Sequence, residues 1–410
     1  MLLQFTFKNF RSFKDENTLD MRATKVKELS YHVRTAGKEK ILPITAIYGA
    51  NASGKSNVIG AYSYFVTNII NGINFNMWNY LSFFFDKNHD DNIFFEVLLY
   101  NTNTNEQYKY GYIISKDKCE QEWLYIKKKS AKTFNPIFKR VDNNISMFNI
   151  DKVLQKGLQS SIQKHTLVLT LGNLLNINIC KNVYMLFVQS RIIDSTSYHA
   201  EQNLKQIPKS VFDDSKIKES LIKYINSFDN SIVDIIIEQS LDSNIVDYNN
   251  IKTVHQLNGT KQRIEFPLYL ESTGTCKMFD LFLTFYFSLK IGNILMIDEL
   301  NTKLHPLLIR AIINLFADPE TNPNNAQLIF TTHDVWLMDA DILRRDEIWF
   351  TEKSSEGISE LYSFVDIKGH DGKTMRKDLN FMKNYMLGKF GGVPNLKQFQ
   401  IEVGNNNGQE

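Results

Sequence analysis

The sequence is poor in cysteine and has almost no net charge. Its 410 residues include three cysteines, Cys119, Cys180 and Cys276, and none of them has the paired spacing of a metal site. An odd, sparse set excludes a disulfide framework, is typical of a reducing compartment and leads us to expect no structural metal. The net charge of +2 comes from 47 basic and 45 acidic residues, so no global field attracts the protein to nucleic acid or to a membrane.

Long apolar runs are also lacking. The most apolar segment, residues 278–297, is interrupted by charged residues and a glycine, which indicates a buried helix followed by a strand and excludes a membrane span. Residues 2–7 alternate between apolar and polar types, unlike the continuous apolar core of a signal peptide. No heptad pattern persists, which excludes a long coiled-coil arm. Since 43% of the residues are hydrophobic, the chain can still bury a sizeable core, and we expect a soluble, cytoplasmic protein.

One glycine-rich segment fits the pattern G-x-x-x-x-G-K-[ST], in which a backbone loop wraps around phosphate groups. It lies between a β-branched run at 44–48 and a stretch with helical apolar spacing at 57–70. The loop therefore precedes a helix N-terminus, whose amides and dipole favour phosphate. We expect Lys55 to reach the β and γ phosphates and the Ser56 hydroxyl to bind Mg²⁺. The predicted nucleotide-binding residues of this loop are Gly49, Ala50, Asn51, Ala52, Ser53, Gly54, Lys55, Ser56 and Asn57.

A second motif, N-I-L-M-I-D-E-L at 293–300, is an apolar strand that ends in two adjacent carboxylates. The carboxyl ends of parallel strands meet at the ligand-binding edge of an α/β sheet. Asp298 is expected to hold Mg²⁺, directly or through water, and Glu299 to polarise the water that attacks the γ phosphate. Taken alone, the segment would fit equally well a buried strand that ends in a charged turn.

A third strand-like run, residues 326–332, is followed by His333. The interval between Glu299 and His333 accommodates one helix, at 306–316, which predicts two parallel strands joined by a crossover. His333 would then lie in the same crevice as Glu299, where an imidazole can hydrogen-bond a γ phosphate. Without these neighbours it would be an ordinary loop histidine.

Ser272, Thr273 and Gly274 precede the strongly apolar residues 278–289 and mark the start of a helix. A hydroxyl and free backbone amides at a helix start form an anion-binding arrangement. Alone, the segment would be an ordinary N-cap. Its position shortly before Asp298 favours the anion-binding interpretation.

The order of these motifs resembles that of ABC-type ATPase heads, including those of SMC and recombination proteins. One family in that class is similar over nearly the whole chain, the RloA-like AAA/ABC-hybrid ATPases of bacteria and archaea. The resemblance implies an α/β P-loop NTPase of the ABC/SMC-head type, with a mixed sheet, flanking helices and a helical insertion lobe. The segments that carry it are N-F-R-S-F-K-D-E at 9–16, G-A-N-A-S-G-K-S-N at 49–57, E-S-T-G-T at 271–275, D-E-L-N-T-K-L-H-P-L-L at 298–308, T-T-H-D at 331–334, R-R-D-E-I-W-F at 344–350 and Y-M-L-G-K-F-G-G-V-P at 385–394.

The resemblance also implies how the site works. ATP, with Mg²⁺, would be sandwiched between the phosphate loop of one subunit and the signature Ser272–Thr273–Gly274 of another, so that hydrolysis needs a homodimer or a higher homo-oligomer. Arg11 would lie close to the nucleotide, and Leu304 and His305 would occupy the segment that crosses between subunits. The predicted catalytic residues are Lys55, Glu299 and His333. Because S-T-G-T stands where ABC proteins have L-S-G-G-Q, the detail of the γ-phosphate contact stays open.

The chain is expected to have three regions. Residues 1–150 form the first half of the ATPase head, with the phosphate loop and a hairpin of strands at 94–100 and 108–115. Residues 151–262 form the helical insertion lobe, since apolar residues there recur at helical spacing. Residues 263–410 complete the head with the signature, the paired carboxylates and the histidine. The polar, glycine-rich end at 404–410 is expected to be disordered.

Two functions are open at this stage. The first, implied by the family, is an ATP-driven switch that controls a separate effector, such as a nuclease or toxin, in an anti-phage module like the PARIS-like or RloA/RloB-like pairs. The alternative is a DNA-repair or chromosome-associated ATPase that acts on nucleic acid directly. The basic run at 127–129 could contact DNA or RNA phosphates, but the near-zero net charge favours a solvated hairpin end. The nucleotide subunit of a transporter fits poorly, because of the large inserted lobe.

Overall fold

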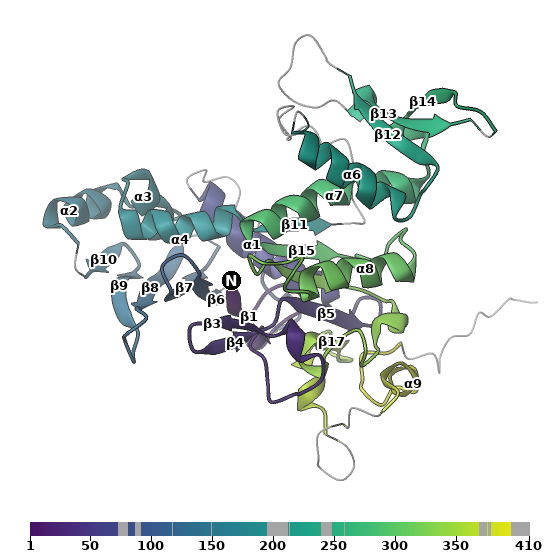
Figure 1. The fold of residues 1–410 in the computed structure, drawn as a ribbon. Coiled ribbons are helices and arrows are strands. Elements are labelled where there is room, and N and C mark those ends of the chain that lie inside the picture. The colour runs from purple at the N-terminus through teal and green to yellow at the C-terminus, as the bar shows by residue number, and fades with distance from the viewer. Residues whose placement is uncertain are drawn as a thin grey trace, which may run out of the picture.

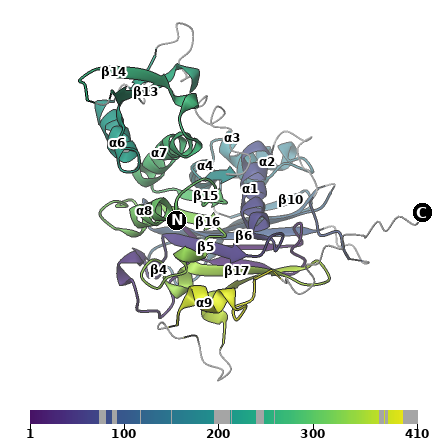
Figure 2. The same cartoon turned by 90° about the vertical axis from the view of Figure 1, so that its right-hand side faces the viewer.

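The computed structural model describes residues 1–72, 81–86, 92–116, 118–148, 150–194, 212, 214–238, 248–257, 259–368, 375 and 379–394. The expected polar end at 404–410 lies outside these residues. Figures 1 and 2 show a head built on two sheets, with a small lobe that stands above it next to α7. No helix in these ranges is both long enough and apolar enough to cross a bilayer.

The central sheet has six strands in the order β11-β15-β16-β5-β17-β18. The first five are parallel, and β18 pairs antiparallel with β17. Parallel strands buried on both faces carry nearly continuous apolar sequences, which is why the runs around residues 44–48, 293–298 and 326–331 became strands. The strands are β5 (Ile44–Gly49), β11 (Arg191–Asp194), β15 (Ile294–Asp298), β16 (Gln327–Thr331), β17 (Ile348–Lys353) and β18 (Ser359–Ser363).

Helices cover both faces of this sheet. On one face, α1 (Lys55–Asn71) packs against β-strand side chains such as Met296 and Ile329. On the other, α7 (Thr273–Ile291) and α8 (Pro306–Ala317) pack against alternate residues such as Leu295 and Phe330. Since α8 connects β15 to the adjacent parallel strand β16, the predicted crossover between the carboxylate pair and the histidine is confirmed.

The second sheet is antiparallel, with seven strands in the order β10-β9-β8-β7-β6-β1-β2. The predicted hairpin is present as β6 and β7, which pair from Ile93 and Ile114 to Asn101 and Glu106. Helices α2 (Lys152–Ser161), α3 (Val168–Leu174) and α4 (Asn178–Val188) share one core with this sheet and α1. The strands are β1 (Leu2–Lys8), β2 (Asn17–Asp20), β6 (Ile93–Asn101), β7 (Glu106–Ile114), β8 (Cys119–Lys127), β9 (Asn135–Val141) and β10 (Asn144–Met147).

The segment expected to form a helical insertion, 151–262, is divided: α2, α3 and α4 pack on the antiparallel sheet, and β11 joins the central sheet. The lobe itself contains strands as well as a helix. It consists of α6 (Ser215–Asn226) and an antiparallel sheet of β12 (Ile232–Ile237), β13 (Ile251–Gln256) and β14 (Arg263–Pro267). The β-branched sequence I-V-D-I-I-I explains β12, since such side chains favour strands. The lobe packs on α7 through Phe279, Phe282 and Leu283.

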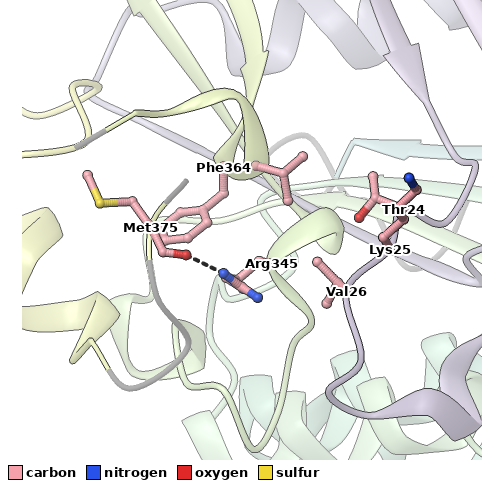
Figure 3. Close-up of a pocket in the computed structure, with 7 residues that line it drawn as sticks. Thr24, Lys25, Val26, Arg345, Phe364 and Met375 are labelled. Carbon is pink, nitrogen blue, oxygen red and sulfur yellow. Dashed lines mark hydrogen bonds between the residues drawn. The ribbon is translucent and has the colours of Figure 1, made fainter. Parts of the chain in front are cut away.

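A buried polar brace joins the N-terminal residues to the R-R-D-E motif. Arg344 makes two hydrogen bonds of 2.9 Å to Asp346, and Arg345 pairs with Glu28 at 2.6 Å. Arg345 also donates to the carbonyl of Met375, as Figure 3 shows beside a cavity of about 420 Å³. Because each charge is paired, these residues are tolerated at low exposure and hold distant parts of the chain together.

Two short elements complete the head: the hairpin β3 (Arg34–Ala36) and β4 (Glu39–Ile41), and the helix α9 (Phe381–Met386).

Candidate functional site

The phosphate loop lies where the sequence placed it, between the end of β5 and the start of α1. Its last glycine, Gly54, is the residue before the helix and has φ +117°, which L side chains rarely adopt. A Cβ atom there would also lie 2.8 Å from the Ser359 hydroxyl oxygen. Ala52 has φ +63°, so the loop turns sharply just before the helix. The backbone thus curls in front of a helix N-terminus, which is an anion-binding geometry.

Lys55 is buried inside this loop, at 5% exposure. Its Nζ donates to the carbonyls of Gly49 and Ala50, each at 3.1 Å. Burial lowers the pKa of Lys55, and the nearby carboxylates of Glu299 and Asp298 partly offset this effect. The ammonium therefore lies among the loop carbonyls with two acids close enough to act on it. Ser56, the next residue, is exposed at the first turn of α1.

The two acids leave the end of β15 in different directions and share one partner. The Thr331 hydroxyl, at the end of β16, donates to Asp298 Oδ1 and accepts a hydrogen bond of 2.7 Å from the Glu299 amide. Glu299 has φ +54°, a left-handed conformation that costs a non-glycine residue roughly 1–2 kcal/mol. A strained backbone conformation of this kind persists only where the surrounding structure fixes it, and such residues cluster at functional sites. Here it accompanies a side chain that turns toward His333.

His333 and Glu299 form a pair, with 3.2 Å between Nε2 and Oε1. This hydrogen bond is the main reason that the pKa of Glu299 is lowered, although burial acts in the opposite direction. The His333 amide donates to Asn301 Oδ1 at 3.4 Å, which ties the loop after β16 to the loop after β15. A carboxylate with a lowered pKa is ionised at neutral pH and is able to accept a proton. Glu299 and His333 thus lie close together, as the sequence predicted.

Arg11 lies beside the first turn of α1. Its guanidinium donates to Asn57 Oδ1 at 3.2 Å, and its backbone has φ +50°. The Asn57 amide in turn donates to the Ser12 hydroxyl at 2.8 Å, and Ser359 donates to the same hydroxyl at 2.8 Å. This chain of contacts links the segment after β1, the first turn of α1 and β18. Arg11 is therefore positioned beside the predicted nucleotide-binding residues.

The signature residues do not join this group. Ser272 caps α7, where its hydroxyl accepts from the Thr275 amide at 3.1 Å. Ser272 and Thr273 are exposed, and Gly274 is half-buried. Within the described residues no hydrogen bond or ion pair connects Ser272, Thr273 or Gly274 to the phosphate loop, Glu299 or His333. We call Ser272–Gly274 the signature start, and residues 49–57 with Asp298, Glu299 and His333 the phosphate-loop face.

One lysine links the signature helix to the paired acids. Lys277 Nζ donates to the backbone carbonyls of Leu300 at 3.4 Å and Thr302 at 2.5 Å. Burial lowers its pKa to about 8, with a further contribution from Lys303. The lysine thus fixes the loop that follows Glu299 against the first turns of α7.

A cavity of about 890 Å³ opens beside the phosphate loop. It is lined by the loop, by His333 and by both ends of residues 385–394, which we call the C-terminal turn. This turn is held by hydrogen bonds of 2.9 Å from the Tyr385 and Tyr362 hydroxyls to the carbonyls of Gly392 and Phe390. Gly392, at φ +64°, brings its backbone so close that a Cβ would lie 3.5 Å from Gly49 Cα. The turn therefore borders the nucleotide-binding loop directly.

Several residues of the site were not anticipated from the sequence. Thr331 bridges the two acids, Thr351 bonds the Ser53 hydroxyl at 2.6 Å, and Lys277 holds the loop after Glu299. Each acts through a partner distant in the sequence. The one local signal was the polar end of an otherwise apolar strand, as in T-T-H-D after β16.

The oxygen donors at the loop fit a magnesium ion. The Ser56 hydroxyl is exposed at the helix start, and Asp298 keeps one carboxylate oxygen beyond its bond to Thr331. Hard oxygen ligands of this type, completed by phosphate and water, are those that Mg²⁺ prefers. Ser56 and Asp298 thus have the chemistry assigned to them from the sequence, and their roles stay predictions.

The fold and the site together define the class of this protein: an α/β protein with a phosphate-binding loop and the fold of P-loop NTPases. The chain belongs to the AAA_21 family, whose description is "AAA domain, putative AbiEii toxin, Type IV TA system" and whose model matches residues 44–339. No curated protein sequence matches the chain. The narrower placement among RloA-like proteins stays a prediction.

One solved structure shares the fold of this chain. An SMC head bound to the C-terminal winged-helix domain of ScpA superposes with a TM-score of 0.51, 14% identity, and coverage of 88% of this chain and 97% of that chain. At this identity the likeness shows the architecture alone. The cbiO1 protein from Clostridium perfringens, part of the ABC transporter complex cbiONQ, matches with a TM-score of 0.32, 12% identity, and coverage of 88% and 87%.

Proposed function

We propose that this protein binds and hydrolyses ATP at a site shared between two copies of the chain. The observation that carries the proposal is the convergence of Lys55, Glu299 and His333 at the end of a parallel sheet, beside a helix N-terminus. A positioned base, a phosphate-facing cation and a loop of backbone amides are the parts that phosphoryl transfer to water requires. The lowered pKa of Glu299 keeps its side chain ionised at neutral pH, the form in which a carboxylate can orient a water molecule.

In this mechanism each residue has a defined role. Lys55 leaves the Gly49 and Ala50 carbonyls to bind the β and γ phosphates, where its charge stabilises the transferring group. Glu299 accepts a proton from the attacking water, and His333 holds the carboxylate in position and donates to a γ-phosphate oxygen. Magnesium held by Ser56 and Asp298 would neutralise charge between the phosphates. Thr331 keeps the two acids apart through its separate bonds to Asp298 and to the Glu299 amide.

The requirement for a second copy follows from the position of the signature start. Its exposed hydroxyls and amides lie at a helix N-terminus, yet they make no bond to the phosphate-loop face among the described residues. A symmetric dimer lets the signature start of each copy meet the phosphate loop of the other. Arg11, beside Asn57, would contact the same nucleotide. The fold shared with SMC heads supports this arrangement.

We propose further that the closed dimer acts as a cytoplasmic switch for a separate effector protein in an anti-phage module. The family description, which refers to a type IV toxin–antitoxin system, supports a role with a partner protein. Lys277 offers a route for the signal, because it connects the signature helix to the loop after Glu299. Closure of the dimer and hydrolysis of ATP would thereby affect both the signature helix and the loop after Glu299.

The test uses Glu299→Gln, which keeps the shape of the side chain and removes the base. We expect kcat to fall by about 10²–10⁴-fold, because a general base contributes that much, and ATP to hold the variant as a dimer by mass measurement. The double variant Lys55→Ala/Glu299→Gln is the matched control and should stay monomeric with ATP. Hydrolysis by Glu299→Gln at the wild-type rate, or a dimer mass that does not depend on ATP, would contradict the proposal. Copurification with the product of the adjacent gene, with and without ATP, tests the effector.

A further inference from the structure

A lysine-rich pocket lies at the end of the antiparallel sheet where three connections meet. These are the turn between β6 and β7, the connection between β8 and β9, and the hairpin of β3 and β4. The cavity has a volume of about 350 Å³. Five of the residues that line it are lysines: Lys38, Lys127, Lys128, Lys129 and Lys132. We call this group the lysine pocket.

In the described part of the chain, the lysines of this pocket have no acidic partner in direct contact. Within the ranges that the structure describes, none of the five lysines forms an ion pair, and no carboxylate lines the cavity. Glu39 and Glu106 come next along the chain to lining residues but do not line the pocket themselves. In a protein whose net charge is only +2, five positive groups around one cavity are a strong local excess.

We propose that the lysine pocket binds the sugar–phosphate backbone of a nucleic acid. Lysine ammonium groups on flexible side chains are suited to bind phosphates, which they contact as point charges. Such contacts do not depend on the base sequence. The pocket also has polar side chains. The Tyr100 hydroxyl donates to Asn105 Oδ1 at 2.7 Å, so the oxygen of the Asn105 amide is occupied and its nitrogen is the group left to donate. The sequence alone favoured a solvated hairpin end for residues 127–129. Folding brings Lys38 and Lys132 to the same cavity as this run. Their added charge favours phosphate binding over a solvated hairpin end.

Other occupants fit the lining less well. Protein–protein interface cores are depleted in lysine and enriched in aromatic and apolar side chains. Here Tyr100 is 4% exposed, and none of the large exposed apolar side chains of the described chain lines the cavity. The same lack of apolar side chains argues against insertion into a lipid surface, which needs an apolar face as well as charge. A phosphodiester backbone requires only the charges and donors that are present.

The pocket is separate from the nucleotide site, and β1 connects the two. At the start of β1 the amino group of Met1 donates to the carbonyl of Tyr100, which lines the pocket, at 2.8 Å. The segment that follows β1 carries Arg11, which contacts Asn57 in the first turn of α1. A strand of this length spans roughly 20 Å at about 3.3 Å per residue. Because the two sites are separate, nucleic-acid binding can be measured without ATP. The result of that measurement does not depend on whether the protein hydrolyses ATP.

The experiment replaces the four exposed lysines of the pocket with glutamine: Lys38, Lys128, Lys129 and Lys132. Binding of a short fluorescein-labelled DNA duplex is followed by anisotropy at several salt concentrations, and the same sequence is tested as single-stranded DNA and as RNA to identify the source. For the wild type we expect a Kd between about 1 and 100 µM at physiological salt. For the variant we expect at least a tenfold loss, and a slope of log K against log salt that is shallower by about 3 to 4.

The matched control removes the same charge elsewhere, by glutamine at four exposed helical lysines: Lys152, Lys156, Lys181 and Lys216. An equal loss of binding in this control would overturn the assignment, because net charge alone would then explain it. Equal affinity of the wild type for a poly-glutamate peptide or an anionic lipid vesicle would also overturn it. A measurement on the wild type needs no variant: DNA should protect Lys128 and Lys129 from acetylation more than Lys152, and equal protection would contradict the proposal.

Discussion

The phosphate-loop face and the signature start are built in opposite ways. The phosphate-loop face gathers side chains from the ends of β5, β15 and β16, and the segment after β1 contributes Arg11 beside it. These residues bond one another, as Glu299 does with His333. The signature start is one short stretch at the beginning of α7, where Ser272 and Thr273 are exposed and the Ser272 hydroxyl caps its own helix.

For the proposed ATP site, the difference indicates which half a single chain is able to complete. The phosphate-loop face is held by partners within the same chain, so one copy has what it needs to bind the phosphates. The signature start is held only as a helix cap, and its further hydrogen-bonding capacity is directed outward. Binding of nucleotide is therefore expected to be a property of one copy, and turnover a property of two. Each variant below tests one side of this contrast.

Lys55→Ala should have the largest effect on binding. It removes the ammonium that faces the phosphates, and charge-assisted hydrogen bonds contribute roughly 1.5–3 kcal/mol each. With two phosphates as partners we expect the Kd for ATP, measured by calorimetry, to rise about 100-fold or more. Lys181→Ala, an exposed lysine on α4, is the control and should bind as the wild type does. An unchanged titration for Lys55→Ala would show that the phosphates bind elsewhere.

A mixing experiment tests the sharing of the site. Ser272→Arg blocks the signature start with a bulky side chain and leaves the phosphate loop intact, so it should bind ATP but not hydrolyse it. Alone, Ser272→Arg and Lys55→Ala should both be inactive. Mixed in equal amounts, half of the dimers combine one copy of each, and one of their two sites is intact, so about a quarter of the wild-type sites return. If mixing restores no activity, the site lies within one chain.

Gly392→Ala examines the C-terminal turn. A Cβ at this position would have to adopt φ +64° and would lie 3.3 Å from the Thr351 carbonyl oxygen, next to the phosphate loop. We expect the KM for ATP to rise by about threefold to tenfold, since left-handed backbone costs roughly 1–2 kcal/mol for a non-glycine residue. Gly259→Ala is the matched control, because Gly259 has φ +74° and nothing within 4 Å of its Cβ position. An equal change in both variants would mean that strain alone is responsible.

The smallest effect concerns Asp280, which is buried in α7 and has no hydrogen-bond partner for either carboxylate oxygen among the described residues. Burial raises its pKa from 3.8 to about 8, so the folded protein keeps a proton that the unfolded chain loses above about pH 4. The wild type should therefore lose stability as the pH rises from 4 to 8. Asp280→Asn removes this dependence, and we expect it to be more stable by about 1–2 kcal/mol at pH 8. Thermal unfolding at pH 5 and pH 8 measures the difference, and parallel pH curves for both proteins would contradict it.

Local signals made much of this structure predictable. The strands at 44–49, 294–298 and 327–331 are continuous apolar runs bounded by motif residues, so both the elements and their shared edge followed from the sequence. The start of α7 followed from Ser272 before an apolar helix. Each of these predictions used residues close together in the chain.

Features made by distant residues could not be predicted in this way. Thr331 meets Asp298 across neighbouring strands, and Arg345 meets Glu28 from the other end of the chain. The lysine pocket needs Lys38 beside a run some ninety residues later. These contacts depend on tertiary pairing and carry no local pattern. The strands of the lobe were missed for another reason: helical apolar spacing was extended to all of 151–262, although I-V-D-I-I-I in β12 favours a strand.

The position of β5 in the central sheet has a consequence for how the protein is made. Its two neighbours, β16 and β17, follow it in the chain by nearly 300 residues. At about 5–20 residues per second, a ribosome delivers them tens of seconds after the phosphate loop has emerged. During that time the apolar strand lacks both of its pairing partners, so the nascent chain depends on a chaperone or on provisional packing against α1 to avoid aggregation.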